Sequence, residues 1–220
     1  MKRLFINAAL GVALVTLNMA CSDFLDIEPK GEAIPQTVDD YAYILNFPDL
    51  MKGGETYPLY LTDDVYLPDV ADNEMVPGLN VKERYIQRLY SFDKDVFGES
   101  VSDALWIAAY QRIFYSNVVI NRVMNATHGT DERKRAIRAT ALAERALEYL
   151  NLVSVYGKHY DPTTAQTDLG VPLITEDDIT QTNLKRATVA QIYDLAEGDL
   201  KTAVNDLPYK AVPNVFKFTK

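Results

Sequence analysis

The only cysteine of the chain, Cys21, stands at the exit of an apolar run near the N-terminus. Lys2 and Arg3 precede this run, which covers residues 4–17 and is shorter than the roughly 20 apolar residues that a membrane span needs. A positive start followed by a short apolar run is typical of a secretory signal peptide. With the small residue Ala20 before the cysteine, the segment resembles a bacterial lipoprotein signal, in which the cysteine thiol receives a lipid.

The lipoprotein motif is atypical in detail. The usual motif has leucine three residues before the cysteine, whereas this chain has Asn18 there and Leu17 one residue earlier. The alternative is an ordinary signal peptide followed by a free thiol. A free exposed thiol is a liability in a secreted protein, so the sequence favours lipidation of Cys21.

Two short groups of acids could bind calcium through their oxygen atoms. One is Asp63 with Asp64, and the other is Glu176 with Asp177 and Asp178. Neither group has the spacing of an EF-hand loop. The favoured interpretation of both groups is therefore solvated surface charge, and we expect no metal site.

The remaining residue types give no sign of an enzyme. One cysteine and the two histidines, His128 and His159, cannot build a Cys₄ or Cys₂His₂ zinc site, and neither histidine has a second histidine nearby. The P-loop and dinucleotide-binding glycine motifs are absent. A glycosidase needs two acids at a defined separation, and nothing selects a pair among the 31 acidic residues. We expect no catalytic residue and no cofactor.

Composition indicates an ordinary globular chain. Its 220 residues are 48% hydrophobic and 24% charged, which argues against a disordered or fibrous protein. The formal net charge is −9, and an acidic chain is repelled by phosphate backbones, so we expect no nucleic-acid partner.

Two long helices are predicted in the middle of the chain. The first covers residues 103–124, where apolar side chains recur at helical spacing over a wide face. Trp106, the only tryptophan, lies on this face, and core packing is favoured over ligand contact for it. The second helix covers residues 131–156, with Thr130 as N-cap and Gly157 as the C′ residue. The turn T-H-G-T joins the helices, so we expect a closely packed antiparallel pair.

Shorter elements surround this pair. Residues 37–47 read as a helix with Thr37 as its N-cap, and residues 82–90 as a short helix or an irregular segment. Residues 48–80 contain four prolines and read as a long irregular loop of a kind that is often functional. Residues 158–187 form a second long connection. For the chain as a whole we expect a mainly α fold with long irregular loops, with or without a short strand pair.

A third long helix begins at Thr188, where Gln191 completes a capping box, and it ends at Pro208. Its predicted apolar stripe consists of Ile192, Leu195, Ala196, Leu200, Ala203, Val204 and Leu207. This stripe needs a partner, and no further helix follows. We therefore expect the chain to be truncated at its C-terminus, the alternative being that the helix packs back on the first pair.

Several strings of residues are informative when taken together. They are C-S-D-F-L-D-I-E-P-K-G from Cys21, residues 106–121, A-E-R-A-L-E-Y-L-N-L-V-S-V-Y-G-K-H-Y at 143–160, the following D-L-G-V-P-L-I-T, and residues 190–208, which end D-L-K-T-A-V-N-D-L-P. Each string is weak alone, but their order and spacing resemble the N-terminal half of the SusD/RagB family of Bacteroidetes outer-membrane lipoproteins.

The resemblance implies a mainly α fold of tetratricopeptide-like helical pairs with long irregular loops. It also implies a lipid-anchored protein of the cell outer membrane, facing outside, that is not an enzyme. Such proteins capture a glycan, here an oligosaccharide or another nutrient, for import through a partner SusC-like TonB-dependent transporter. The alternative is a helical-repeat scaffold that binds protein partners or peptides without a glycan ligand.

A glycan-binding role would require flat aromatic faces with polar groups around them. The best local candidates are Tyr57, Tyr60 and Tyr66, with Asp63 and Asp64 between them. The alternative for these tyrosines is a loop packed on the helical core or on the transporter, and the sequence favours that alternative.

The expected domain organisation has three parts. Residues 1–20 form the lipoprotein signal peptide, and residues 21–35 form a tether. Residues 36–220 form a SusD-like N-terminal helical region that is truncated at its C-terminus.

Overall fold

The computed structural model describes residues 35–46, 57–64, 84–96, 102–178, 180–181, 184–208 and 218–219. The chain divides into one unit from Met1 to Pro35 and a second from Gln36 to Lys220. The predicted signal peptide, the lipidation site Cys21 and residues 21–34 of the tether lie outside the described residues.

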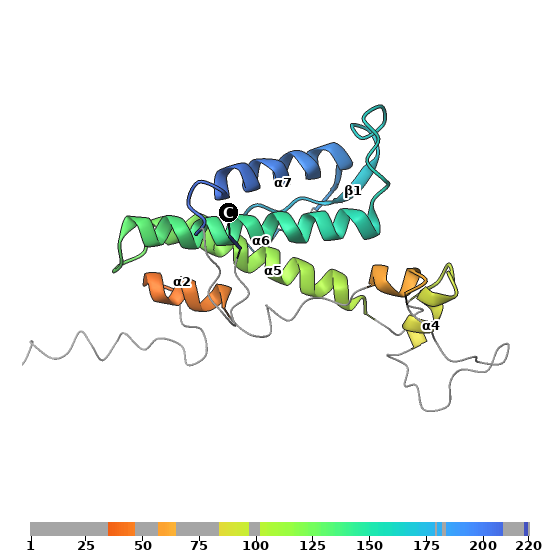
Figure 1. The fold of residues 1–220 in the computed structure, drawn as a ribbon, viewed down its shortest axis with the longest axis horizontal. Helices are drawn as coiled ribbons and strands as arrows, with labels where there is room; N and C mark the ends of the chain where they lie inside the picture. The colour runs from red at the N-terminus through yellow and green to blue at the C-terminus, as the bar shows by residue number, and fades with distance from the viewer. Residues whose placement is uncertain are drawn as a thin grey trace, which may run out of the picture. The chain divides into compact units, whose positions relative to one another are not determined.

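Two long antiparallel helices form the centre of the second unit (Figure 1). Helix α5 runs Ala104–Arg122 and continues into the 3₁₀ turn η3, Val123–Asn125, while helix α6 runs Asp131–Tyr156. The predicted N-cap Thr130 is confirmed, because its side chain accepts a hydrogen bond from the backbone N–H of Arg133. The expected pair of helices joined by a short turn is therefore confirmed.

The end of α6 differs from the prediction. Gly157 caps the helix in an extended conformation with φ −100°, so it does not adopt the left-handed conformation of a C′ glycine. A Cβ atom at this position would lie 2.7 Å from the backbone oxygen of Val153. The chain needs glycine here for close approach to the last turn of α6.

Smaller helical elements pack at the two ends of the pair. Helix α2, Val38–Leu45, has the predicted N-cap Thr37, and Asp40 completes its capping box. Helix α4, Arg84–Tyr90, shows that the helical alternative for this segment is the correct one. The predicted irregular loop instead contains a 3₁₀ helix, η2, at Tyr57–Leu61, which fits proline at its second residue because proline is tolerated in a first helical turn.

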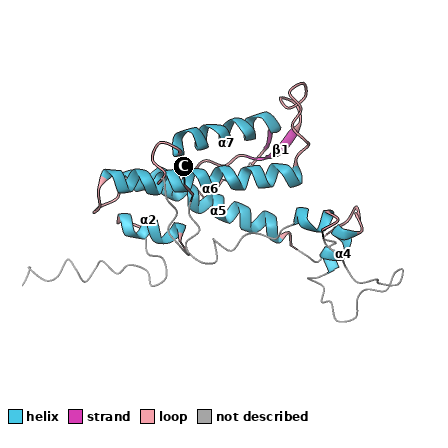
Figure 2. Ribbon diagram, viewed as in Figure 1, coloured by secondary structure: helices cyan, strands magenta, loops and turns pink. Residues whose placement is uncertain are grey.

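The long connection after α6 contains a short strand pair, whose position the sequence did not predict (Figure 2). Strand β1, Leu169–Pro172, pairs antiparallel with β2, Arg186–Thr188. Helix α7, Val189–Ala203, follows directly with the predicted Thr188 and Gln191 capping box. It packs along α6, so the third helix finds its partner in the first pair (Figure 1).

The predicted stripe of α7 is partly wrong. Ile192, Ala196 and Ala203 are buried as expected, but Leu200 and Val204 are exposed. The buried face is rotated because Asp199 faces α6, where Arg145 pairs with it. At the position of Asp199, α6 and α7 are therefore joined by an ion pair and not by the apolar contact that the sequence predicted.

The apolar core consists of two clusters. One lies around Ile113, Leu152 and Ile192, and the other around Val119, Leu142 and Ala203. All three long helices also carry buried polar side chains. Among the described residues these are Arg112, Ser116, Asn117, Glu144, Arg145, Glu148 and Asp199. We call these seven residues the polar layer. Within the described residues, no helix is both long enough and apolar enough to span a membrane.

Candidate functional site

Aromatic side chains gather where α5 begins and α6 ends. The ring of Trp106 lies 4.8 Å from that of Tyr110 and 5.0 Å from that of Tyr156, the latter in an edge-on arrangement. All three side chains are partly buried and pack against the first apolar cluster. We call Trp106, Tyr110 and Tyr156 the aromatic cluster. One part of each ring is packed on the core, and another part remains accessible to solvent.

Asp103 fixes the orientation of this cluster. As the N-cap of α5, it accepts a hydrogen bond from the backbone N–H of Trp106 at 3.0 Å. The hydroxyl of Tyr57 donates to the same carboxylate at 3.0 Å, and the hydroxyl of Tyr156 donates at 2.5 Å. One carboxylate therefore connects η2, the start of α5 and the end of α6.

The tyrosine hydroxyls of the cluster act as hydrogen-bond donors. Burial raises the pKa of Tyr156, and the hydrogen bond to Asp103 raises it further. Burial also raises the pKa of Tyr110, whose hydroxyl donates to the backbone oxygen of Pro172 at 2.8 Å. Both hydroxyls stay protonated at physiological pH. The aromatic surface of the cluster is therefore uncharged.

Only some of the residues predicted as ligand contacts lie close to this cluster. Tyr57 is 2% exposed and belongs to the core, and Tyr60 is partly buried against the same core. Asp63 and Asp64 are exposed, while Tyr66 lies outside the described residues. Their contact with a ligand remains a prediction, and the burial of Tyr57 agrees with the packing alternative.

Sequence reasoning did not identify the aromatic cluster. Trp106 packs against the core as expected, but it is not fully buried, and the sequence did not indicate that Tyr156 would meet it. Trp106 and Tyr110 are one helical turn apart, which was a usable signal. Tyr156 comes from a different helix, so its place next to Trp106 depends on tertiary structure.

The other candidate residues occupy loops. His128 lies in the turn before α6 with φ 59°, and His159 lies in the exposed segment after α6. Asp177 pairs with Arg122, and Asp178 accepts hydrogen bonds from the backbone and hydroxyl of Thr180. Among the residues that the structure describes, no group of three or more His, Cys, Asp or Glu side chains is arranged to hold a metal ion.

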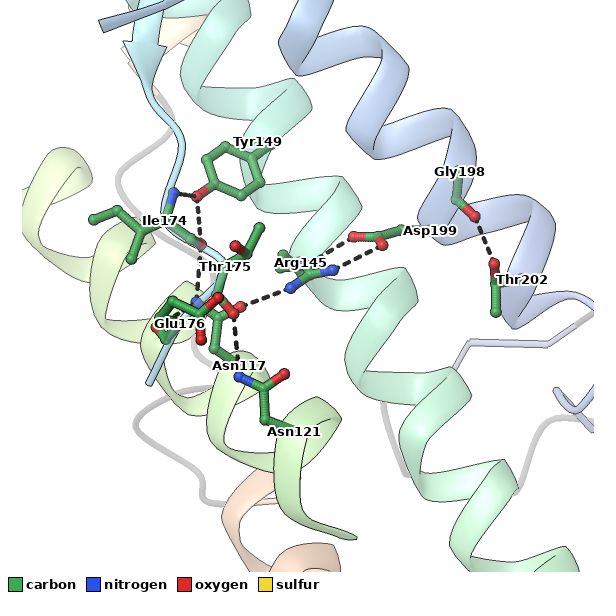
Figure 3. A network of polar contacts seen from close by, with 10 residues as sticks. All are labelled: Asn117, Asn121, Arg145, Tyr149, Ile174, Thr175, Glu176, Gly198, Asp199 and Thr202. Carbon is green, nitrogen blue, oxygen red and sulfur yellow. Dashed lines mark hydrogen bonds and ion pairs between the residues drawn. The ribbon is translucent and has the colours of Figure 1, made fainter. Parts of the chain in front are cut away.

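Polar side chains of α5 and α6, with Asn117 of the polar layer among them, hold the segment after β1 against these helices (Figure 3). The amide nitrogen of Asn117 donates to the backbone oxygens of Ile174 at 2.9 Å and Glu176 at 3.1 Å. The hydroxyl of Tyr149 donates to the oxygen of Ile174 at 2.9 Å and accepts from its N–H at 2.7 Å. Asn121 binds the oxygen of Thr175 at 3.1 Å. Side chains of the helices thus satisfy backbone groups that have no sheet partner.

The polar layer also contains a second buried glutamate beside an ion pair. Arg112 binds Glu148 through two hydrogen bonds of 2.7 and 2.8 Å. Glu144 lies one turn away on α6 and is 8% exposed. Burial, with the nearby negative charge of Glu148, raises the pKa of Glu144 to about 7. Its carboxyl is therefore largely protonated in mildly acidic solution.

Comparison with known sequences points to one family. The sequence profile of a SusD-like family, described as "Starch-binding associating with outer membrane", matches residues 23–220. A comparison with curated protein sequences found no significant match.

Solved structures share the fold. A SusD superfamily protein from Bacteroides vulgatus is 22% identical, with a TM-score of 0.65 over 83% of this chain and 40% of its own. A laminarin-binding SusD-like protein is 23% identical, with a TM-score of 0.61 over 84% of this chain and 38% of its own. A SusD superfamily protein from Bacteroides thetaiotaomicron is 20% identical, with a TM-score of 0.61 over 82% and 39%. The chain spans about two fifths of the length of these structures.

Proposed function

The chain belongs to the SusD-like family described as starch-binding and associated with the outer membrane, and we propose that it captures a glycan, most simply an oligosaccharide, at the cell surface. The observation that carries this proposal is the aromatic cluster of Trp106, Tyr110 and Tyr156, whose rings are only partly buried. Support also comes from one protein of similar structure, which is a laminarin-binding SusD-like protein.

Binding at the cluster is non-covalent. The apolar face of a sugar ring stacks on an aromatic face, and hydrogen bonds from surrounding polar groups fix its orientation. Before a ligand arrives, Asp103 already holds the hydroxyl of Tyr156 and the backbone N–H of Trp106, and the Trp106 ring packs on the first apolar cluster. A site that is already ordered loses less conformational entropy on binding, which increases affinity.

The test of glycan capture is a panel of soluble polysaccharides that includes starch and laminarin. The full chain is titrated with each by isothermal calorimetry, with released reducing sugar measured in parallel. The proposal expects saturable binding of at least one glycan without hydrolysis. No binding across the panel by a folded chain would instead favour the helical scaffold, and hydrolysis that depends on one acidic residue would favour an enzyme.

Membrane attachment is part of the proposal. Cys21 carries a lipid after removal of residues 1–20, and residues 21–35 tether the protein to the outer membrane with its binding region facing outside. Stable anchoring requires more than one acyl chain, as a bacterial lipoprotein cysteine typically carries. Labelled palmitate is expected to enter the wild-type protein and not the Cys21→Ser variant. Equal labelling of both would contradict lipidation of this thiol.

The proposed partner is a SusC-like TonB-dependent transporter. A tethered protein beside a transporter raises the local concentration of ligand at the pore. Detergent pull-down of the native protein from its own membranes, followed by identification of co-purified proteins, tests this. A co-purified TonB-dependent barrel is expected, and its absence in the presence of folded protein would contradict the partnership.

A further inference from the structure

We propose that Tyr160 and Tyr193 form a second glycan-contact site at the junction of the loop after α6 with the N-terminal part of α7. The two rings lie 4.9 Å apart, tilted by 64°, and form an aromatic corner. Tyr160 is 41% exposed and Tyr193 is 36% exposed. This proposal rests on the proposed function, since it assigns a second contact for the same class of ligand.

The loop that carries Tyr160 is fixed to the start of α7. The backbone N–H of Val189 donates to the oxygen of Asp168 at 2.8 Å, and that of Ala190 donates to the oxygen of Ala165 at 3.0 Å. Ala165 itself is buried in the first apolar cluster. These bonds join the two segments that carry the tyrosines, so the corner exists before a ligand arrives.

Hydrogen bonds inside the loop add to this order. Asp161, the residue after Tyr160, accepts from the backbone N–H of Thr163 at 2.8 Å and from its hydroxyl at 2.6 Å. Lys158 pairs with Asp168 at 2.5 Å, so the loop is closed on itself by an ion pair. The side chain of Tyr160 therefore projects from an ordered segment.

The exposed tyrosines have features of a sugar contact. Within the described part of the chain, neither hydroxyl of the corner makes a hydrogen bond, so both are available to a ligand. Polar residues lie near both tyrosines in the sequence. His159 and Asp161 flank Tyr160 in sequence, and Glu197 follows Tyr193 by one helical turn, paired with Lys201 at 2.6 Å. Rings bordered by hydrogen-bonding groups suit the apolar and polar faces of a sugar.

A protein partner fits this corner less well. A stable protein interface buries about 800 Å² on each side, and here the charged Glu197 interrupts the apolar surface between Tyr193 and Leu200. The corner is also at the same end of the helices as the aromatic cluster, since α5 begins and α6 ends there (Figure 1). Tyr156 of the cluster and Tyr160 of the corner are only four residues apart in the sequence. One extended glycan is a suitable ligand for both sites.

The test compares four variants of the full chain in titrations with soluble starch and laminarin. Tyr160→Ala and Tyr193→Ala are each expected to lower the association constant about tenfold, and Tyr193→Phe to lower it less, because the ring supplies the stacking and only the hydroxyl is lost. Leu200→Ala is the matched control, since Leu200 lies on the exposed side of the same helix. Circular dichroism and thermal unfolding check that every variant is folded.

The outcomes separate this inference from the proposed function. If the wild type binds neither probe, glycan capture of these polymers fails and the second site fails with it. If the wild type binds and both alanine variants bind equally well, only the second site is wrong. An equal loss of glycan affinity in Leu200→Ala would also overturn the second site, because the loss would then not be specific to the two tyrosines.

Discussion

Arg145 and Asp199 form a two-point ion pair that is buried between α6 and α7. The guanidinium nitrogens Nε and Nη2 lie 2.8 Å from the carboxylate oxygens Oδ2 and Oδ1, and both side chains are almost fully removed from solvent. The remaining nitrogen, Nη1, donates to the amide oxygen of Asn117 on α5 at 2.8 Å. One arginine therefore joins three helices at the level of the polar layer (Figure 3).

Removal of one partner of this pair is expected to be strongly destabilising. Asp199→Asn leaves the charge of Arg145 buried without its counter-ion, which costs about 3–5 kcal/mol in the free energy of unfolding. The control is Asp194→Asn, an exposed position on the same helix, with a change below about 0.5 kcal/mol. Urea denaturation followed by circular dichroism measures both, and similar values for the two variants would contradict the structural role of the pair.

Loss of the Asn117 amide is expected to release the segment after β1. Asn117→Ala removes the hydrogen bonds to the oxygens of Ile174 and Glu176 and leaves Arg145 without one acceptor. The expected cost is about 2–3 kcal/mol, with faster proteolysis between residues 173 and 185. Asn151→Ala, at an exposed position of α6, serves as the control. Unchanged proteolysis of the segment would show that other contacts hold it.

Glu144 is expected to make stability depend on pH. Its pKa rises from 4.5 to about 7 on folding, so the folded state binds the proton more tightly than the unfolded state. The resulting stabilisation is complete below about pH 4.5 and is lost as pH rises through about 7. Its size is on the order of 3 kcal/mol.

Glu144→Gln provides the corresponding measurement. The neutral amide cannot titrate, so the variant should lack the fall in stability between pH 5 and 8 that the wild type shows, and it should be the more stable protein at pH 8. Denaturation series at several pH values compare them. Parallel pH profiles for the two proteins would contradict a buried titrating Glu144.

Tyr57 is expected to stabilise the fold without contacting the ligand. Its hydroxyl donates to Asp103 and accepts from the backbone N–H of Leu105 at 3.3 Å. Tyr57→Phe should therefore lower the free energy of unfolding by about 1–2 kcal/mol and leave glycan affinity unchanged. A folded variant with reduced affinity at equal stability would instead support the original prediction of ligand contact.

The helices were predictable because their signals are local. Thr37, Thr130 and Thr188 each precede a helix and cap it in the structure, and the apolar spacing of the helix pair needs no tertiary information. The turn between the two long helices was visible for the same reason. Local hydrogen bonding and periodicity therefore fixed the type and order of the main elements.

The polar layer and the aromatic cluster were not predictable by the same reasoning. Arg145 and Asp199 are 54 positions apart, and each reads as an ordinary charged residue of an amphipathic helix. Burial of both depends on how α7 rotates against α6, which also left Leu200 and Val204 exposed. Trp106 and Tyr156 likewise meet only after the helices pair. These arrangements depend on contacts between segments that are distant in the sequence, and such contacts cannot be inferred from a single sequence.

The fluorescence of Trp106 tests the central claim most directly, because Trp106 is the only tryptophan and belongs to the aromatic cluster. The full chain is titrated with soluble starch, laminarin and other soluble glycans while its emission spectrum is recorded. We expect a saturable shift of tryptophan emission with at least one glycan, because the sugar covers the ring and displaces water. An emission spectrum that stays unchanged with every glycan, while the chain remains folded, would contradict glycan capture at this cluster.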